Sequence, residues 1–525
     1  MNRVVVIGGG VGGLSAATDL ARRGFEVVVL ERGRSVGGKM REVEIGGRRI
    51  DAGPTVLTMR WVFEELFADA GDDLDARVTL RPASILARHA WEDGSGLDLF
   101  ADEDASVQAI TSFAGAAEAD GYRRFCAYAR RIYEAVERPF LRSQRPTVLS
   151  LLALVGRTGL RTVADIDGRR TLWGALGDFF RDPRLLQLFG RYATYSGSSP
   201  FLAPATLNVI AHVEREGVFS VEGGMARLAE ALRALATRAG ATIRCGEEVA
   251  SITVAGGRAR GVVLTTGEAL AADAVVMNGD VAALADGSLG PGPARAVAAP
   301  KERSLSAVTF ALVAEASGFP LVRHNVFFSS DYRAEFRDLF ERACLPRSPT
   351  VYVCAQDRGD AAREPGALEA GPGSGPERLL CLINAPATGD RNPLTTSEID
   401  RCETITLERL RRAGLSLRPI EPRVVTTPSD FHRLFPGTGG ALYGATSHGL
   451  GAALSRAPSR TRLPGLYLAG GSAHPGAGVP MAALSGRLAA QSLAEDLAST
   501  GRSRATGMPG GTSTPSATTG STRSA

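Results

Sequence analysis

The beginning of the chain places a glycine-rich turn between two short apolar segments. Val4–Ile7 is rich in β-branched residues and too short for a buried helix, so it predicts a buried strand. The turn that follows, Gly8–Gly13, contains five glycines and one valine. Leu14–Arg23 then predicts a helix, and Phe25–Leu30 a second buried strand. Strand, glycine turn, helix and strand in this order predict a dinucleotide-binding α/β unit.

Three of these glycines, Gly8, Gly10 and Gly13, have the spacing G-x-G-x-x-G. The first permits a tight turn, the second lets a pyrophosphate approach the backbone, and the third lets the helix pack closely on the sheet. The start of the helix offers free N–H groups and a positive dipole end to the phosphates. Glu31, eighteen residues after Gly13, can accept hydrogen bonds from a ribose. A turn without a ligand is the alternative, and the placement of the turn and of Glu31 favours dinucleotide binding.

Two loops after the second strand are further candidates for the cofactor site. One contains Gly37, Gly38 and Lys39, and the other is Asp51-Ala52-Gly53-Pro54-Thr55. We expect the paired glycines to approach the cofactor and Lys39 to supply charge near its phosphates or its ring. Both segments also fit plain surface loops.

A second strand, glycine loop and helix occur near the other end of the chain. Leu466–Ala469 predicts a short buried strand, and a helix is expected from about Ala482 to Ala498. The loop between them is Gly470-Gly471-Ser472-Ala473-His474-Pro475-Gly476-Ala477-Gly478-Val479-Pro480-Met481. The start of this helix can stabilise negative charge on a reduced cofactor ring.

The length and composition limit the class of protein. A chain of 525 residues exceeds the size at which one core stops growing, so we expect at least two domains. Six cysteines without paired spacing predict reduced thiols in a cytosolic protein, no metal-ligand pattern is present, and no signal peptide is visible. Two uncharged stretches, Tyr192–Val213 and Leu463–Gly486, contain polar and helix-breaking residues, which fits the lining of a dry pocket better than a membrane-spanning helix.

The region from Tyr122 to Arg191 is unusually basic and has a helical pattern. It contains 14 Arg and six Asp or Glu, a net charge of +8, whereas the whole chain has a net charge of only +4. Within it, the apolar segment Val148–Val155 is flanked by arginines on both sides, which suits a helix lying in an anionic membrane surface. An ordinary core helix with solvated ends explains the pattern equally well. Nucleic acid is a poor alternative, because no binding module accompanies the charge.

The rest of the chain completes two domains. After Gly217 the pattern returns to a helix and strands, as expected where a nucleotide-binding domain resumes, and from Ser304 to about Ala445 strands dominate. Asp357–Gly375 predicts a long surface loop. We predict a discontinuous cofactor domain from residues 1–70, 216–290 and 446–499, and a substrate and membrane-association domain from 71–215 and 291–445. Residues 500–525 predict a disordered tail.

Taken together, these segments resemble the carotenoid-desaturase branch of the flavin amine-oxidase superfamily over most of residues 1–499. The resemblance rests on the glycine turn, Gly37-Gly38, Asp51-Ala52-Gly53-Pro54-Thr55, Val221-Glu222-Gly223-Gly224-Met225 and the C-terminal glycine loop. Lys39 stands where the family usually has arginine, which keeps the charge and loses a bidentate fork. The segments most similar to the 1-hydroxycarotenoid 3,4-desaturases are Lys39-Met40, Asp51–Phe63, Val351–Arg358 and Asn384-Ala385-Pro386, and phytoene desaturases are close neighbours.

The resemblance implies an α/β protein with a discontinuous, amine-oxidase-like Rossmann domain for FAD and an inserted α+β substrate domain whose helical region faces a membrane. It implies hydride transfer from a linear, 1-hydroxylated carotenoid to FAD, which forms a new double bond. A cytoplasmic enzyme on the inner face of the cell membrane is expected, because its substrate dissolves in the bilayer. The residues expected at FAD are Gly8, Gly10, Gly13, Glu31, Arg32, Gly37, Gly38, Lys39, Gly53, Pro54, Thr55, Val249, Gly470, Gly471, Gly478, Val479 and Met481.

The catalytic base, the exact carotenoid and the final electron acceptor stay open. His474 is the best candidate base by position, although a loop histidine is more often structural. Arg191 and Tyr195 border an uncharged stretch and are candidates to meet the hydroxylated end of the substrate, although a solvated arginine and a packed tyrosine are the simpler interpretations. The rival functions are a phytoene desaturase, an amine or porphyrinogen oxidase, and a prenyl-lipid carrier of the same fold without redox chemistry.

Overall fold

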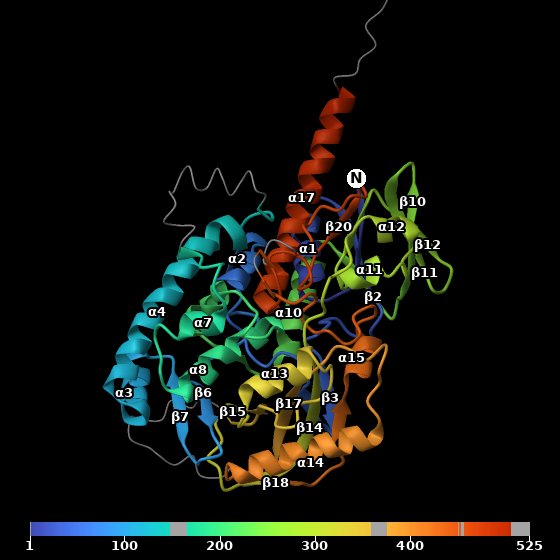
Figure 1. Ribbon diagram of the computed structural model, residues 1–525. Coiled ribbons are helices and arrows are strands. Elements are labelled where there is room, and N and C mark those ends of the chain that lie inside the picture. The colour runs from blue at the N-terminus through green and yellow to red at the C-terminus, as the bar shows by residue number, and fades with distance from the viewer. Residues whose placement is uncertain (1, 147–164, 359–374, 450, 453–455, 506–525) are drawn as a thin grey trace, which may run out of the picture.

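The computed structural model describes residues 2–146, 165–358, 375–449, 451–452 and 456–505. A five-stranded parallel sheet lies in its upper part, with strand order β20-β13-β1-β2-β9 (Figure 1). Its strands are β1 (Arg3–Ile7), β2 (Glu26–Glu31), β9 (Thr242–Cys245), β13 (Ala274–Met277) and β20 (Leu466–Leu468). Strands from both ends and the middle of the chain therefore build one sheet, which is the expected discontinuous arrangement.

Both faces of this sheet are covered, which explains why its strands are continuous apolar runs. On one face, Val4 and Val6 pack against α1 (Val11–Arg22), α10 (Met225–Arg238) and α17 (Val479–Ala505). On the other face, Val5 and Val275 pack against the antiparallel sheet of β10 (Val249–Ala255), β11 (Arg258–Leu264) and β12 (Ala269–Ala271). The short helices α11 (Val281–Ala285) and α12 (Pro291–Arg295) contribute to that second layer.

An eight-stranded mixed sheet forms the lower part of the protein (Figure 1). Its order is β18-β14-β17-β16-β15-β6-β7, and β19 also pairs with β14. The strands are β6 (Ile85–Ala90), β7 (Gly96–Phe100), β14 (Ser306–Ser317), β15 (His324–Phe327), β16 (Val351–Ala355), β17 (Glu377–Ala385), β18 (Ser416–Pro419) and β19 (Val424–Thr426). The amphipathic helix α14 (Thr396–Arg412) covers one face, and the hairpin of β3 (Glu42–Ile45) and β4 (Arg48–Asp51) covers part of the other.

A third, mostly helical layer lies beside this sheet. It contains α3 (Glu103–Ala114), α4 (Ala116–Val136), the π-helix η1 (Glu137–Leu141), α7 (Leu172–Leu176), α8 (Pro183–Gly190), the 3₁₀ helices η2 (Arg191–Ser196) and η3 (Ala205–Asn208), and α9 (Val209–Arg215). Stacked aromatic rings such as Phe125, Phe180 and Phe189 form its core. Within the described residues, no helix is long and apolar enough to cross a bilayer. The apolar segment Val148–Val155 lies outside the described residues.

The remaining elements connect these layers: α2 (Trp61–Asp69), β5 (Leu80–Pro82), β8 (Phe219–Val221), α13 (Tyr332–Phe340) and α15 (Pro428–Leu434). The predicted strands and long helices are present within a few residues of their expected bounds. One boundary differs: α17 continues to Ala505, so the first residues of the expected tail are helical, and its end projects from the protein in Figure 1. Residues 506–525 and most of the predicted loop after Asp357 lie outside the described residues.

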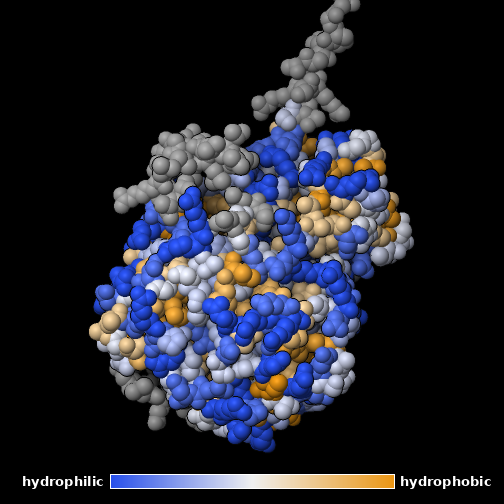
Figure 2. All heavy atoms as spheres, viewed as in Figure 1, coloured by the Kyte–Doolittle hydropathy of each residue, from blue (hydrophilic) through white to orange (hydrophobic). Residues whose placement is uncertain are grey.

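On the face shown in Figure 2, hydrophilic residues cover much of the surface and apolar residues occur between them in separate patches. The visible, described part of this face therefore offers no continuous apolar surface.

Candidate functional site

The first glycine turn has the conformation that its sequence predicts. Gly8 has a positive φ of 97°, which favours glycine. A Cβ added to Gly13 would lie 2.1 Å from the carbonyl oxygen of Gly8, so only glycine lets α1 start this close to β1. Gly10 is the N-cap of α1, and no side chain caps the helix. The first N–H groups of α1 are therefore available to an anionic ligand.

Glu31 lies at the end of β2, beside the glycine turn. Its two carboxylate oxygens accept hydrogen bonds of 2.7 Å each from the backbone N–H groups of Gly9 and Gly33. These bonds fix the carboxylate and leave lone pairs for a ligand hydroxyl. The backbone of Glu31 also accepts from Glu247, which brings the start of β10, and with it Val249, to this end of the site.

Arg32, by contrast, forms an ion pair with Glu248 and donates to the carbonyl of Arg433. Its guanidinium is already occupied at the surface of the protein.

The paired glycines lie directly against the first turn. The N–H of Gly37 donates to the carbonyl of Gly9 over 2.9 Å, and a Cβ on Gly38 would lie 3.3 Å from the Cα of Gly10. A Cβ on Gly53 would lie only 1.8 Å from the carbonyl oxygen of Lys39. Three glycine segments that the sequence singled out therefore pack backbone against backbone.

The C-terminal glycine loop meets the N-terminal one. A Cβ on Gly486 would lie 2.0 Å from the carbonyl oxygen of Gly12, so α17 and α1 pack almost without side chains between them. Gly470 donates its N–H to the hydroxyl of Ser485 in α17, and its φ is 100°. Gly478 precedes α17 and accepts from the N–H of Ala482. Gly471 lies in the loop itself, whereas Val479 and Met481 lie in the first turn of α17.

Asn278 joins the two loops and was not among the predicted site residues. Its Nδ2 donates to the carbonyl of Gly8 over 3.0 Å. Cβ atoms added to Gly12 and Gly470 would lie 2.6 and 2.8 Å from its Oδ1. The sequence signal was present, because Asn278 ends the buried strand β13, but its partners are more than 190 residues away on one side and 260 on the other.

Two buried cations lie between the glycine segments. Lys39 donates to the carbonyl of Leu442, and Arg456 donates to the carbonyl of Gly471 over 2.8 Å. Among the described residues, neither has a carboxylate within ion-pair distance. Burial lowers the pKa of Lys39 and lowers the pKa of Arg456 to about 10, while Asp280 opposes both shifts. Arg456 was missed, because no motif surrounds it in the sequence.

Asp51 connects the cofactor segments to the eight-stranded sheet. Its carboxylate accepts from the N–H of Met225 at the start of α10, which links two segments that the sequence had noted separately. Its backbone N–H and carbonyl form two bonds of 2.9 Å with the side chain of Gln356. Burial raises the pKa of Asp51 to about 6, and the hydrogen bond from Met225 opposes that shift.

Pro54 and Thr55 continue from this joint toward a buried polar group of residues. The hydroxyl of Thr55 lies 2.8 Å from the hydroxyl of Tyr352, which lies 2.8 Å from Nδ1 of His324. His324 is fully buried, and burial lowers its pKa to about 3. A neutral imidazole, a phenol and a hydroxyl therefore form one chain from the cofactor segment into β16 and β15.

Arg191 and Tyr195, the predicted substrate residues, are in contact at the same place. Arg191 donates to the hydroxyl of Tyr195 over 3.2 Å, and its guanidinium lies over the rings of Tyr195 and Tyr352, at 5.2 and 5.6 Å. Tyr195 in turn donates to Glu214 over 2.6 Å, and Tyr192 donates to the other oxygen of Glu214 over 2.7 Å. Glu214 was not predicted, because an isolated glutamate in α9 reads as a solvated residue.

His474 is completely buried in the C-terminal loop. Its Nε2 lies 2.9 Å from the carbonyl oxygen of Ser143, and its ring contacts the edge of Phe140 at 4.7 Å. Burial lowers its pKa, so the imidazole is neutral near pH 7. These contacts attach the C-terminal loop to η1 of the helical layer.

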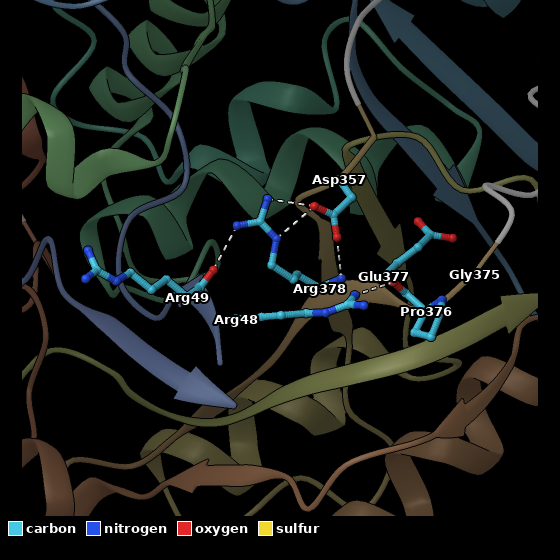
Figure 3. A pocket seen from close by; sticks show the side chains of 7 residues that line it. All are labelled: Arg48, Arg49, Asp357, Gly375, Pro376, Glu377 and Arg378. Carbon is cyan, nitrogen blue, oxygen red and sulfur yellow. Dashed lines mark hydrogen bonds and ion pairs between the residues drawn. The ribbon is translucent and has the colours of Figure 1, made fainter. Parts of the chain in front are cut away.

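A separate polar cavity of about 430 Å³ lies between β4 and β17 (Figure 3). The guanidinium of Arg378 binds Asp357 and the carbonyl of Arg49, and Arg48 donates to the carbonyl of Pro376. None of the predicted site residues lines this cavity. Among its lining residues, Arg378 pairs with Asp357, whereas Glu377 pairs with Arg358 outside the lining.

The class of protein follows from a match to the family of flavin containing amine oxidoreductases over residues 11–494. The chain belongs to this family and is an FAD-dependent oxidoreductase, with the predicted Rossmann-type α/β fold. Two glycine loops in contact, an uncapped helix start and two buried cations without a carboxylate partner among the described residues fit the pyrophosphate of FAD.

Comparison with relatives in sequence narrows the assignment of the chain within this family. The chain is 53% identical to the hydroxyneurosporene desaturase of Rubrivivax gelatinosus, over 99% of this chain and 98% of the relative. It is 47% identical to that of Cereibacter sphaeroides, over 95% and 99%. It is 32% identical to the 4,4'-diapolycopene oxygenase of a Methylomonas species, over 94% and 98%. The chain therefore belongs to the carotenoid desaturase family.

Solved structures agree in fold. An oxidoreductase from Methanosarcina mazei has a TM-score of 0.56 at 16% identity, over 94% of this chain and 100% of that one. Putrescine oxidase bound to putrescine has a TM-score of 0.56 at 14% identity, over 95% and 99%. At such identities the likeness concerns the fold alone.

Proposed function

We propose that this protein is a carotenoid 3,4-desaturase that introduces a double bond into a 1-hydroxylated acyclic carotenoid such as 1-hydroxyneurosporene. The single observation that supports this most is 53% identity to a hydroxyneurosporene desaturase along essentially the whole of both chains. The identity to the 4,4'-diapolycopene oxygenase is lower, at 32%.

The glycine turn, the paired glycines and the C-terminal loop hold FAD in this proposal. The start of α1, with Gly10 and Gly38, receives the pyrophosphate, and Lys39 and Arg456 neutralise it. Glu31 accepts from the adenosine ribose, and Val249 lies at the adenine end. Gly53, Pro54 and Thr55 and the loop from Gly470 to Met481 lie at the flavin ring. Arg32 contributes least, because Glu248 and Arg433 already occupy it.

When bound, FAD accepts the hydride equivalent that leaves one carbon of the polyene, while the neighbouring carbon loses a proton. The residues of this chain orient the polyene and exclude water from it. The uncharged stretch 192–213 and the apolar core of the helical layer suit a hydrocarbon chain. The contacts of His474 favour a structural role over that of a base, because its Nε2 is already used on Ser143.

We also propose that the two-domain division predicted from the sequence holds. The strands of the five-stranded sheet all come from residues 1–70, 216–290 and 446–499, and those of the eight-stranded sheet come from 71–215 and 291–445.

A peripheral position on the inner face of the cell membrane is part of the proposal, because the substrate dissolves in the bilayer. Of the arginines beside Val148–Val155, Arg142 pairs with Glu65 and Glu137, and Arg145 donates to the carbonyl of Arg456. These two are therefore largely used inside the protein. Flotation with anionic and with neutral liposomes tests the proposal, and equal absence from both contradicts it.

The enzymatic proposal is tested with the FAD-loaded protein in liposomes that contain either 1-hydroxyneurosporene or phytoene. We expect the absorption bands of the hydroxylated carotenoid to move to longer wavelength as conjugation extends. Turnover of phytoene alone would support a phytoene desaturase instead. Peroxide released from a primary amine in oxygen would support an amine oxidase, and a colourless protein that does not take up FAD would support a lipid carrier.

A further inference from the structure

Glu214 is a partly buried carboxylate with an unusual set of neighbours. Each of its oxygens accepts one tyrosine hydroxyl, from Tyr195 over 2.6 Å and from Tyr192 over 2.7 Å. No lysine or arginine lies within ion-pair distance of it among the described residues. Burial raises its pKa, and the two tyrosines oppose that shift. A carboxylate has about four acceptor positions, so two remain for a further donor.

Arg191 supplies the complementary half of this group. Its guanidinium has five N–H donors, and the described residues accept a hydrogen bond from it only at Tyr195. Its guanidinium carbon lies over the rings of Tyr195 and Tyr352, 5.2 and 5.6 Å from their centroids. Arg191 and Glu214 are both hydrogen-bonded to the hydroxyl of Tyr195, so the remaining donors of one lie near the remaining acceptor positions of the other. A ligand hydroxyl can donate to the carboxylate and accept from the guanidinium at the same time.

The group of Arg191, Tyr195, Tyr192 and Glu214 lies close to the cofactor segments, which indicates what it can bind. Gly53 packs against Lys39 in the glycine segments, and Thr55, two residues later, is hydrogen-bonded to Tyr352. The ring of Tyr352 lies under the guanidinium of Arg191. A series of contacting residues therefore leads from the glycine segments to Arg191. In a 1-hydroxylated carotenoid the oxygen is three single bonds from C3, about 3–4 Å away from the bond that becomes unsaturated. A 3,4-desaturase must therefore bury a hydroxyl close to its flavin, and a buried hydroxyl without a partner is unfavourable.

We propose that Glu214 determines specificity for the hydroxylated end of the substrate: the hydroxyl donates to Glu214 and accepts from Arg191, and Tyr195 and Tyr192 hold the carboxylate in place. This proposal rests on the proposed function and adds the residue that recognises the hydroxyl of the substrate. A carotenoid that ends in methyl groups would exclude water from Glu214 and Arg191 without supplying the hydroxyl as a hydrogen-bonding partner, so it binds more weakly. Polar sites of this type reject an analogue without the hydroxyl far more strongly than apolar pockets discriminate by size.

The test compares binding of two acyclic carotenoids, 1-hydroxyneurosporene and neurosporene, to the FAD-loaded protein by quenching of flavin fluorescence. We expect wild type to bind the hydroxylated carotenoid at least about tenfold more tightly. Glu214→Gln keeps the volume and loses the charge. We expect it to reduce the ratio to within about threefold of one, because it weakens the bond to the hydroxyl and removes the charge that neurosporene leaves desolvated. FAD content and thermal unfolding are measured for each variant.

Glu335→Gln is the matched control, because Glu335 is another carboxylate that is buried, accepts from Thr350 and has no hydrogen bond to this group. It should leave the binding ratio unchanged. If Glu214→Gln does not retain FAD, Tyr195→Phe supplies the same test, since it removes one bond to Glu214 and one from Arg191.

The inference is overturned if wild type binds both carotenoids equally, if the variants keep the wild-type ratio, or if they weaken both ligands alike. Failure of the proposed function is a separate outcome. If the wild-type protein binds the hydroxylated carotenoid more tightly but converts neither carotenoid, desaturation is refuted. Recognition of the hydroxyl by Glu214 is then still supported.

Discussion

The cofactor region and the substrate region of this protein are built by different means. Around the glycine loops, contacts run from backbone to backbone, as where Gly37 donates to Gly9 and where Gly486 allows α17 to lie on Gly12. Around Arg191, contacts run from side chain to side chain, through Tyr195, Glu214 and Tyr352. The first region offers a ligand its shape and the start of a helix, and the second offers side-chain donors and acceptors.

This difference has a consequence for tolerance to mutation. In a region where two backbones touch, almost any side chain is too large, so the sequence is restricted to glycine. In a region where side chains touch, the identity of each residue can vary so long as hydrogen-bonding partners vary with it. The cofactor region should therefore respond to added volume, and the substrate region to altered polarity.

Gly13→Val tests the cofactor half of the comparison and has the largest expected effect. Its Cβ would overlap the carbonyl oxygen of Gly8, so α1 must move away from β1. We expect a loss of at least about 3 kcal/mol in the free energy of unfolding and no retained FAD. Gly177→Ala is the control, since Gly177 has helical dihedrals and its added Cβ makes only ordinary contacts. Flavin absorbance of the purified protein and thermal unfolding measure both. A yellow, stable Gly13→Val protein would refute the backbone description.

Asp51→Asn tests the joint between the two regions. Because the pKa of Asp51 in the folded protein is about 6, above its ordinary 3.8, the folded state binds more protons than the unfolded state between these values. Stability from this residue therefore falls as the pH rises from about 4 to 6, by ~3 kcal/mol. Asparagine still accepts from Met225 and cannot ionise, so the difference between wild type and variant should change with pH in this window. Denaturant unfolding at a series of pH values measures it, and a constant difference would show that Asp51 does not ionise there.

The sequence predicted the local fold around the first glycine turn, because its features are local. Gly8, Gly10, Gly13 and Glu31 lie within 24 residues, and their spacing alone implies a strand, a turn and a helix. Arg191 and Tyr195 drew attention because they lie next to an uncharged stretch, which is again a local feature, and their role toward a substrate stays a prediction.

The residues that the sequence could not reveal are those whose partners are distant. Glu214 and Arg456 have no motif around them, and each acquires its contacts from a residue that folding brings near. Gln356 lies within Val351–Arg358, but nothing in that segment indicates its bonds to Asp51. Short, unpatterned elements such as the β3–β4 hairpin and β8 were also missed, since a strand of three or four residues has too few positions to show a period.

Lys39→Met tests a side chain in the cofactor region, where most contacts are between backbones. If Lys39 neutralises the pyrophosphate, its loss should weaken FAD binding about 10–100-fold. The apo protein should be as stable as wild type or more so, because a buried cation without a carboxylate partner among the described residues has been removed. Lys301→Met is a matched control, because Lys301 is the other lysine of the chain and is exposed. FAD titration and apo unfolding separate the two effects, and equal losses in both would mean that Lys39 only supports the fold.

His474→Gln has the smallest expected effect and decides whether a side chain in the C-terminal loop does chemistry. If His474 only attaches the loop to η1, losing its contact with Ser143 should cost about 1 kcal/mol of stability. Turnover of the carotenoid should stay within about threefold of wild type and keep its pH profile, whereas loss of a true general base costs about 10²–10⁴-fold. Phe140→Leu removes the ring contact on the same side and should reproduce the pattern. If His474→Gln alone abolishes turnover while FAD content is unchanged, the cofactor region contributes a catalytic side chain after all, and the division between backbone and side-chain regions fails at that residue.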